Sequence, residues 1–306
     1  MENGFAPAKI NLSLRIIGQR EDGYHLLSSL VLFAEQQGDE VQLTPADDGQ
    51  DRLFISGPFT DDLKHFHADV LTDNILGKTL ASFRRICPKA AKQYFHIHLM
   101  KNLPLGGGIG GGSSDATALL RLLSQYYASD IQMEDLYKIA VNIGADVAVC
   151  LQPNAQHMQG IGENITPLQL QSPIPALLIN PYTHLATVDI FKHYHTRSIA
   201  FSKAHHLINE GDENDDDKES NKKQISLENI APYLHNDLLA SACHFAPEIA
   251  LLLQKLQDEK ECVYANMSGS GATCFALCKS EKDAFALAQK MRYSFPKAWI
   301  KTSLLV

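Results

Sequence analysis

Gly106-Gly107-Gly108-Ile109-Gly110-Gly111-Gly112-Ser113-Ser114 is the most informative stretch of this 306-residue chain. Six of its first seven positions are glycine, so backbone N–H groups can turn inward around an anion without obstruction by side chains. The apolar residues that follow have the spacing of a buried helical face, and we predict a helix over residues 115–127 with Ser113 and Ser114 as N-cap residues. The positive end of such a helix favours anions. The stretch therefore predicts a phosphate-binding loop.

Other glycine-rich motifs fit this stretch less well. A flexible linker does not usually lie between a strand and an amphipathic helix. No Gly-Lys-Ser/Thr closes the loop, which excludes a Walker A motif. Gly106, Gly108 and Gly111 match GxGxxG formally, but the loop lies a third of the way along the chain and no clear βαβ repeat follows it. A dinucleotide site is therefore disfavoured.

The regions around the loop alternate between strand and helix patterns. Residues 8–17 alternate apolar and polar side chains, which predicts a strand with one buried face and places Lys9 and Asn11 together on the other face. Further strands are predicted at 40–43, 52–56, 95–100 and 176–180, and further helices at 74–85 and 133–143. Gly144 ends the last of these helices at a C′ position, which leaves Asp146 at a junction. This is the pattern of an α+β protein.

The sequence becomes proline-rich and irregular around residues 170–175, and we place a domain boundary there. The predicted domains are residues 1–170 and 171–306. Residues 209–224 contain seven acids, three lysines and no apolar residue, which predicts a solvated, mobile loop.

Composition excludes several classes of protein. The formal net charge of −8 disfavours nucleic acid as a partner. No segment has the length and apolarity of a membrane span, and the N-terminus has no signal-peptide pattern. The six cysteines are scattered without CxxC pairs, as is typical of thiols in a reducing compartment. We expect a cytoplasmic protein.

Five short motifs follow one another along the chain: Pro7-Ala8-Lys9-Ile10-Asn11-Leu12, Asp22-Gly23-Tyr24-His25, the glycine loop, Gly144-Ala145-Asp146-Val147 and Ser268-Gly269-Ser270-Gly271-Ala272. Their order resembles that of the GHMP kinases. The resemblance implies a two-domain fold, with an N-terminal ATP-binding domain like domain 2 of ribosomal protein S5 and a ferredoxin-like C-terminal domain. It also implies an active site in the cleft between the domains.

Two of these motifs favour one substrate. The lysine-first form of the first motif and the Asp22–His25 tetrapeptide resemble members that phosphorylate the 2-hydroxyl of a methylerythritol carried on cytidine diphosphate, in isoprenoid precursor synthesis. Two departures, Ala148 where proline is frequent and Asp115 where asparagine is common, leave the implied functional atoms in place. A GHMP kinase for another small alcohol, such as homoserine or mevalonate, and a nucleotide-binding relative without activity stay open as alternatives.

The resemblance implies roles for two charged residues. Asp146 would be the base for the acceptor hydroxyl, although by itself a helix N-cap explains an aspartate there. Lys9 would lie beside it and oppose developing negative charge, although a lone lysine on a strand is most often a surface cation.

The implied acceptor site contains aromatic and polar residues. Tyr24 and His25 suit a cytosine ring, Phe191 would be the second aromatic, and Thr187 and Asn11 would supply polar contacts. A core role for Phe191 explains it equally well.

The implied ATP site consists of the loop residues Gly106, Gly107, Gly108, Ile109, Gly110, Gly111, Gly112, Ser113 and Ser114, together with Asn74, Lys101 and Pro104. Mg²⁺ is expected with the triphosphate, and its protein ligands are unknown from sequence. His65-Phe66-His67 and His96-Ile97-His98 place imidazoles two apart, but without a third ligand we expect solvated histidines. The expected partner is a small-molecule substrate, for a monomer or weak homodimer.

Overall fold

The computed structural model describes residues 2–65, 71–127, 131–197, 199–204 and 225–306. Its contacts divide the chain into two compact units. Unit 1 comprises Met1–Lys9, Gln36–Leu105 and Gly110–Pro153, and unit 2 comprises Ile10–Glu35, Gly106–Ile109 and Asn154–Val306. The chain thus passes between the units several times, and the glycine loop is shared by them.

The sheet of unit 1 carries the strands that surround the loop. They are β1 (Glu2–Asn11), β3 (His25–Ala46), β4 (Arg52–Ser56) and β5 (Tyr94–Met100), of which β1 and β3 continue into unit 2. β5 pairs antiparallel with β3, from Glu40↔Met100 to Ala46↔Tyr94, and β4 pairs parallel with β5. Strands predicted at 40–43, 52–56 and 95–100 are confirmed, although the first belongs to a much longer strand.

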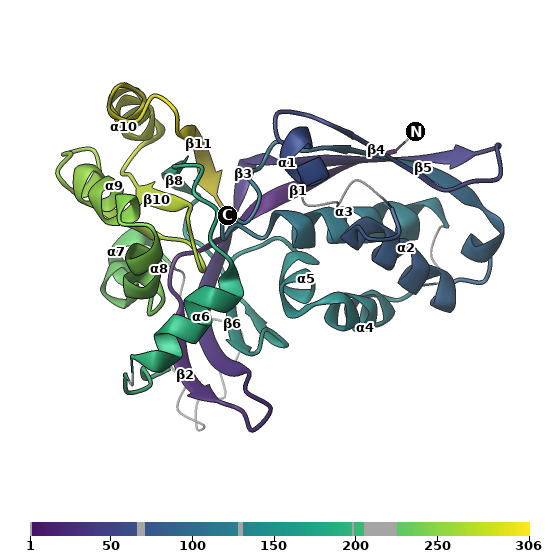
Figure 1. Ribbon diagram of the computed structural model, residues 1–306, viewed down its shortest axis with the longest axis horizontal. Coiled ribbons are helices and arrows are strands. Elements are labelled where there is room, and N and C mark those ends of the chain that lie inside the picture. Colours follow the sequence, from purple (N-terminus) through teal and green to yellow (C-terminus); the bar gives the residue numbers. More distant parts are fainter. Residues whose placement is uncertain (1, 66–70, 128–130, 198, 205–224) are drawn as a thin grey trace. The chain divides into compact units, whose positions relative to one another are not determined.

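Helices cover one face of this sheet (Figure 1). They are α2 (Ile75–Ile86), α3 (Gly111–Tyr126), α4 (Met133–Ile143) and α5 (Ala145–Cys150), while α1 (Thr60–His65) and the 3-10 turn η1 (Ala90–Lys92) are short connections. α3 is the most buried of the long helices because apolar residues from Ala116 to Leu123 are enclosed almost all round. The bounds predicted for α4 are correct, and those for α2 are shifted by one residue.

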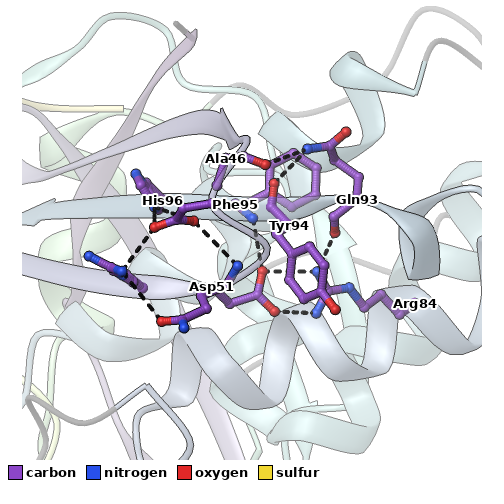
Figure 2. Close-up of polar contacts among 10 residues, drawn as sticks. Ala46, Asp51, Arg84, Gln93, Tyr94, Phe95 and His96 are labelled. Carbon is purple, nitrogen blue, oxygen red and sulfur yellow. Dashed lines mark hydrogen bonds and ion pairs between the residues drawn. The ribbon is translucent and has the colours of Figure 1, made fainter.

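A polar cluster fixes α2 against the sheet (Figure 2). The Arg84 guanidinium donates to both carboxylate oxygens of Asp51 and also to the carbonyls of Ala90 and Gln93. Asp51 in turn accepts from the backbone N–H of Phe95 at 2.8 Å. This bidentate pair therefore ties the end of α2, the η1 turn and the start of β5 together.

Unit 2 contains its own strands. They are β2 (Arg15–Gln19), β6 (Gln156–Gly160), β7 (Asn164–Pro167), β8 (Ile174–Asn180), β9 (Tyr264–Met267), β10 (Cys274–Leu277) and β11 (Trp299–Leu305). The first part of β3 pairs antiparallel with β2 and β6, and β8 pairs antiparallel with both β10 and β11. The strand predicted at 176–180 is confirmed as part of β8.

Helices of unit 2 pack on its sheet around an apolar core. They are α6 (Thr187–Thr196), α7 (Leu227–Ile230), α8 (Leu239–Phe245), α9 (Glu248–Gln257) and α10 (Glu281–Ser294), with the 3-10 turn η2 (Ala231–Tyr233). Fully buried Leu252, Leu256 and Leu287 from α9 and α10 meet Ile179 of β8 in this core. The core holds the short β9–β10 connection, residues 268–273, in place.

Three sequence predictions need correction. The strand predicted over 8–17 is two strands, because β1 ends at Asn11 and β2 begins at Arg15. Lys9 and Asn11 do not lie on an open face, since both side chains are buried. The loop-following helix begins at Gly111 rather than residue 115, so Ser113 and Ser114 lie inside its first turn and are not its N-cap.

Two predictions remain untested. The domain boundary at residue 170 remains a prediction. The two compact units are defined by residue contacts, and such units need not follow the domain boundaries of a protein family. The acidic segment 209–224 lies outside the described residues.

Candidate active site

Lys9 and Asp146 form an ion pair in unit 1. Lys9 lies on β1 with its side chain only 4% exposed, whereas the Asp146 side chain is 52% exposed, and Lys9 Nζ lies 2.8 Å from Asp146 Oδ1. The buried aliphatic stem of Lys9 thus holds its ammonium against the accessible carboxylate of Asp146. Such a pair can accept a proton and oppose negative charge at the same place.

The chain turn before α5 explains the position of Asp146. α4 ends at Ile143, Gly144 is extended with φ 171°, and α5 begins at Ala145. Gly144 is the N-cap residue, so Asp146 lies within the first turn of α5 and does not cap it. Gly144 ends α4 as predicted, as its C-cap residue, and its extended φ differs from the left-handed conformation that glycine often has at helix ends.

The second half of the glycine loop lies directly against Lys9. Gly110 has φ +63°, and a Cβ atom at this position would lie 3.1 Å from Lys9 Cβ and Cε. Only glycine therefore combines the left-handed backbone with this close approach. Gly110 is the N-cap residue of α3, and no side chain among the described residues caps the helix. The first N–H groups of α3 are thus available to an anion.

Ser114 has a different role from the predicted cap. Its side chain is fully buried and its hydroxyl donates to the Pro7 carbonyl at 2.6 Å. This bond ties α3 to β1 two residues before Lys9. Ser113 lies in the same helical turn and is partly exposed.

The other predicted nucleotide residues are buried in unit 1. Asn74 is the N-cap residue of α2 and accepts from the N–H of Leu76 at 2.9 Å. The Lys101 side chain is 2% exposed. Pro104, which lies between Lys101 and the glycine loop in the sequence, is also buried. The structure thus gives Asn74 and Lys101 structural partners, and their direct contact with a nucleotide remains a prediction.

Lys101 belongs to a buried charged cluster that sequence analysis missed. Its ammonium donates to Asp39 of β3 and, at 2.9 Å, to Asp115 of α3, and all three side chains are buried. Burial raises the pKa of Asp115 well above its usual range; Lys101 opposes this shift, and Asp39 adds to it. Burial by itself would lower the pKa of Lys101, but the two carboxylates outweigh it and raise that pKa. No local pattern marks Asp39, because its partners are distant in sequence.

The first half of the glycine loop is held within unit 2 by the residue 268–273 connection. The Ser268 hydroxyl donates to the Gly108 carbonyl at 2.9 Å and accepts from the Asn11 N–H at 3.0 Å. The Thr273 N–H donates to the Gly107 carbonyl. The side-chain amide nitrogen of Asn236 also stabilises this connection by donating to the carbonyls of Met267 and Gly269. Ser268 was recognised in sequence only as a motif member, without a site role.

Asn11 is the buried polar residue of this part. Its amide nitrogen donates to the Ser29 hydroxyl at 2.8 Å, and that hydroxyl donates to the Ser13 carbonyl. A Cβ atom at Gly269 would lie 3.4 Å from Asn11 Oδ1. The amide is therefore oriented by Ser29, with its oxygen towards the connection.

The predicted aromatic residues lie in unit 2 around α6. The His25 and Phe191 rings stack with centroids 5.1 Å apart, and Phe191 also packs against the apolar core. Burial, together with His195, lowers the pKa of His25, which favours a neutral ring. The Tyr24 side chain is 63% exposed. Thr187 begins α6, and its hydroxyl lies 2.8 Å from that of Ser270. Thr187 thus lies at the start of α6, and His25 stacks on Phe191 in the middle of that helix.

The possible metal-ligating side chains are dispersed over the part of the chain that the structure describes. Across the described residues, His, Cys, Asp and Glu nowhere gather in a group of three that could hold a metal ion. His96 instead contacts Asp48, and His98 stacks on Phe54, while His67 lies outside the described residues. The expected Mg²⁺ therefore remains a prediction, and none of the described residues is assigned as its ligand.

Comparison with known proteins assigns the chain to a class of enzyme. Residues 74–153 match the GHMP kinases N terminal domain, and residues 226–297 match the GHMP kinases C terminal domain. Within the described residues, no helix has the length and apolarity needed to cross a membrane.

Individual relatives narrow the class. A protein of Caulobacter vibrioides named 4-diphosphocytidyl-2-C-methyl-D-erythritol kinase is 35% identical over 303 residues, which cover 98% of this chain and 97% of the relative. The crystal structure of a 4-(cytidine 5'-diphospho)-2C-methyl-D-erythritol kinase superposes with a TM-score of 0.74 at 25% identity and 99% coverage of both chains. A homoserine kinase from Cytophaga hutchinsonii shares the fold, with a TM-score of 0.68, 18% identity and coverage of 98% and 93%. The chain therefore belongs to the GHMP kinase family, in the branch formed by the 4-diphosphocytidyl-2-C-methyl-D-erythritol kinases. The predicted α+β GHMP kinase fold is confirmed.

Proposed function

We propose that this chain transfers the γ-phosphoryl group of ATP to the 2-hydroxyl of 4-diphosphocytidyl-2-C-methyl-D-erythritol, giving the 2-phosphate and ADP in the non-mevalonate isoprenoid pathway. The Lys9–Asp146 pair beside Gly110 carries the proposal, because it places a base and a cation at the open start of α3. The near full-length similarity to kinases of that name supports the choice of acceptor.

The proposed chemistry uses the two charged side chains differently. Asp146 accepts the proton of the 2-hydroxyl. At the same time the hydroxyl oxygen bonds to the γ-phosphorus, and the bond between the γ-phosphorus and the ADP oxygen breaks. Lys9 stabilises the developing alkoxide, and its buried stem fixes the ammonium in position.

The triphosphate is assigned to the glycine loop. N–H groups from Gly111 to Ser113 point out of the start of α3, and glycine leaves their approach unobstructed. Mg²⁺ bound to the triphosphate would neutralise its charge. The predicted contacts of Asn74, Lys101 and Pro104 are kept as part of this proposal.

Acceptor recognition is assigned to unit 2. Tyr24 and the stacked His25–Phe191 pair would bind the cytosine ring, Thr187 would add a polar contact, and Asn11 would bond to the methylerythritol part. We also propose a cytoplasmic monomer or weak homodimer, and the six free cysteines support the reducing compartment.

A coupled assay tests the proposal. The protein is incubated with MgATP and each of 4-diphosphocytidyl-2-C-methyl-D-erythritol, homoserine and mevalonate, and ADP release is measured with and without acceptor. We expect release that depends on the cytidine substrate, with a phosphorylated product seen by mass spectrometry. ADP release that is independent of acceptor, or preference for another alcohol, would contradict the proposed acceptor.

A further inference from the structure

Two carboxylates of the buried charged cluster of unit 1, Asp39 and Asp115, have no task in the proposed reaction. Asp39 lies in β3, Lys101 directly follows β5 and Asp115 lies in α3, so the cluster joins the elements on either side of the loop. Burying charged groups is costly unless their bonds are well made. The arrangement of those bonds therefore indicates what each residue does.

Asp39 makes many more bonds than Asp115. One Asp39 oxygen accepts from the N–H groups of Asn102 and Leu103, at 2.6 and 2.8 Å, and its other oxygen accepts from the Lys101 ammonium. Asp115 accepts only from Lys101 through Oδ2, and its Oδ1 is buried with no hydrogen-bond partner among the described residues. Asp39 thus fixes the segment that leads into the loop, whereas Asp115 adds a single bond.

The cluster also touches the start of the phosphate-binding helix. A Cβ atom at Gly111 would lie 3.0 Å from Lys101 Nζ and 3.4 Å from Asp39 Oδ2. Gly111 is the first residue of α3 and therefore lies directly on the cluster. The side of Gly111 where a side chain would stand faces Lys101, so the ammonium lies in close contact with the start of the helix.

We propose that Asp39 is a positioning residue for the nucleotide site: it holds residues 101–103 and the Lys101 ammonium beneath Gly111, and so sets the place of the phosphate-binding N–H groups. Asp39 then acts on the nucleotide indirectly, through Lys101 and the loop. This inference rests on the proposed assignment of the triphosphate to the start of α3, and it does not depend on which alcohol is the acceptor.

The two carboxylates offer a matched pair of substitutions. In Asp39→Asn, the amide must turn its NH₂ group towards a donor, because both oxygens of Asp39 accept hydrogen bonds. In Asp115→Asn, the carbonyl oxygen can face Lys101 while the NH₂ group takes the place of the unpartnered Oδ1. The same chemical change should therefore disturb the loop only at position 39.

The experiment measures MgATP and ADP affinity of the full chain by calorimetry, without acceptor, at a temperature where circular dichroism shows each variant folded. We expect Asp39→Asn to weaken binding about tenfold or more, and Asp115→Asn to stay within about twofold. In the acceptor assay, Asp39→Asn should raise KM for ATP and largely keep kcat at saturating ATP, because the Lys9–Asp146 pair is untouched. Wild-type affinity in folded Asp39→Asn, or equal loss in both variants, overturns the proposal.

Gly111→Ala decides the matter if Asp39→Asn does not fold. Alanine suits a helical position, but its Cβ would press on Lys101. We expect weaker nucleotide binding, and unchanged affinity would overturn the proposal. Because binding is measured without acceptor, failure of this inference is distinct from failure of the proposed phosphorylation.

Discussion

Lys9 owes its position to residues that are distant in sequence. Its stem packs under Gly110, and its ammonium reaches Asp146, 137 residues away. The alternatives raised by the sequence, a surface lysine and a capping aspartate, do not describe these side chains, since Lys9 is buried and Gly144 caps α5. At this scale, the site is a pair and not two separate residues.

Asp146→Asn should reduce turnover by about 10²- to 10⁴-fold, because the amide keeps the shape of the side chain and loses its basicity. Steady-state kinetics with the cytidine substrate measures this change. Asp135→Asn is the matched control, since Asp135 also lies in the first turn of a helix and pairs with a lysine, Lys138, at 3.1 Å. Near-normal turnover in Asp146→Asn would remove it as the base.

Tyr24→Ala should raise KM for the cytidine substrate roughly tenfold while KM for ATP changes little, because stacking on a base contributes about 1–3 kcal/mol. The exposed side chain can be truncated without loss of core packing. Tyr293→Ala, which removes an even more exposed tyrosine, is the control and should change neither KM. Equal changes in both KM values for Tyr24→Ala contradict the stacking role.

Two helix starts of unit 1 carry residues of the proposed nucleotide site. The N-cap residue of α3, Gly110, has no side chain to cap the helix, whereas the side chain of Asn74 caps α2. The contrast has a physical basis, because a capped helix has its first N–H groups already satisfied and an uncapped one can offer them to phosphate. Gly111 and Gly112 open the first turn of α3, so the prediction that Ser113 and Ser114 cap this helix was wrong.

Asn74→Ala should lower the free energy of unfolding by about 1 kcal/mol through loss of the α2 cap. Asn74→Asp keeps the cap oxygen and should be close to wild type in stability. Denaturant unfolding measures both values. Ser280→Ala, which removes the cap of α10, is the matched control and should lower stability without changing KM for ATP.

The same three Asn74 and Ser280 variants test the predicted nucleotide contact. If Asn74 also donates to ATP through its amide nitrogen, Asn74→Asp raises KM for ATP at unchanged stability. An unchanged KM in that variant would show that Asn74 acts only as a cap.

At the scale of the whole molecule, two units share strands β1 and β3 and the glycine loop. One sheet continues through both units by way of β3, an apolar core fills unit 2, and all six cysteines are free. Burial of the Asp39–Lys101–Asp115 cluster lowers the free energy of unfolding of unit 1. The pH dependence of unfolding therefore reports on that cluster.

Asp115→Asn should gain in melting temperature relative to wild type as the pH rises above about 4. Because its folded pKa is raised, Asp115 keeps its proton in the folded chain while the unfolded carboxyl ionises, so wild-type stability falls as pH rises towards the folded pKa. Asparagine does not titrate and removes this loss. Thermal unfolding from pH 4 to pH 8 measures the difference, and a difference that is constant with pH contradicts a protonated Asp115.

The sequence alone determined the strands and helices with strong local patterns, and it predicted phosphate binding by the glycine loop. Hydrophobic period acts over a few residues, and so α4 and β4 were predicted well. The ordered motifs also indicated the family, which the relatives confirm. Only the tertiary structure decided that Lys9 is buried against Asp146, that Ser114 bonds to β1, and that Asp39 and Asp115 share Lys101 beneath Gly111. These contacts join residues far apart along the chain, and no local pattern encodes which distant partners folding will bring together.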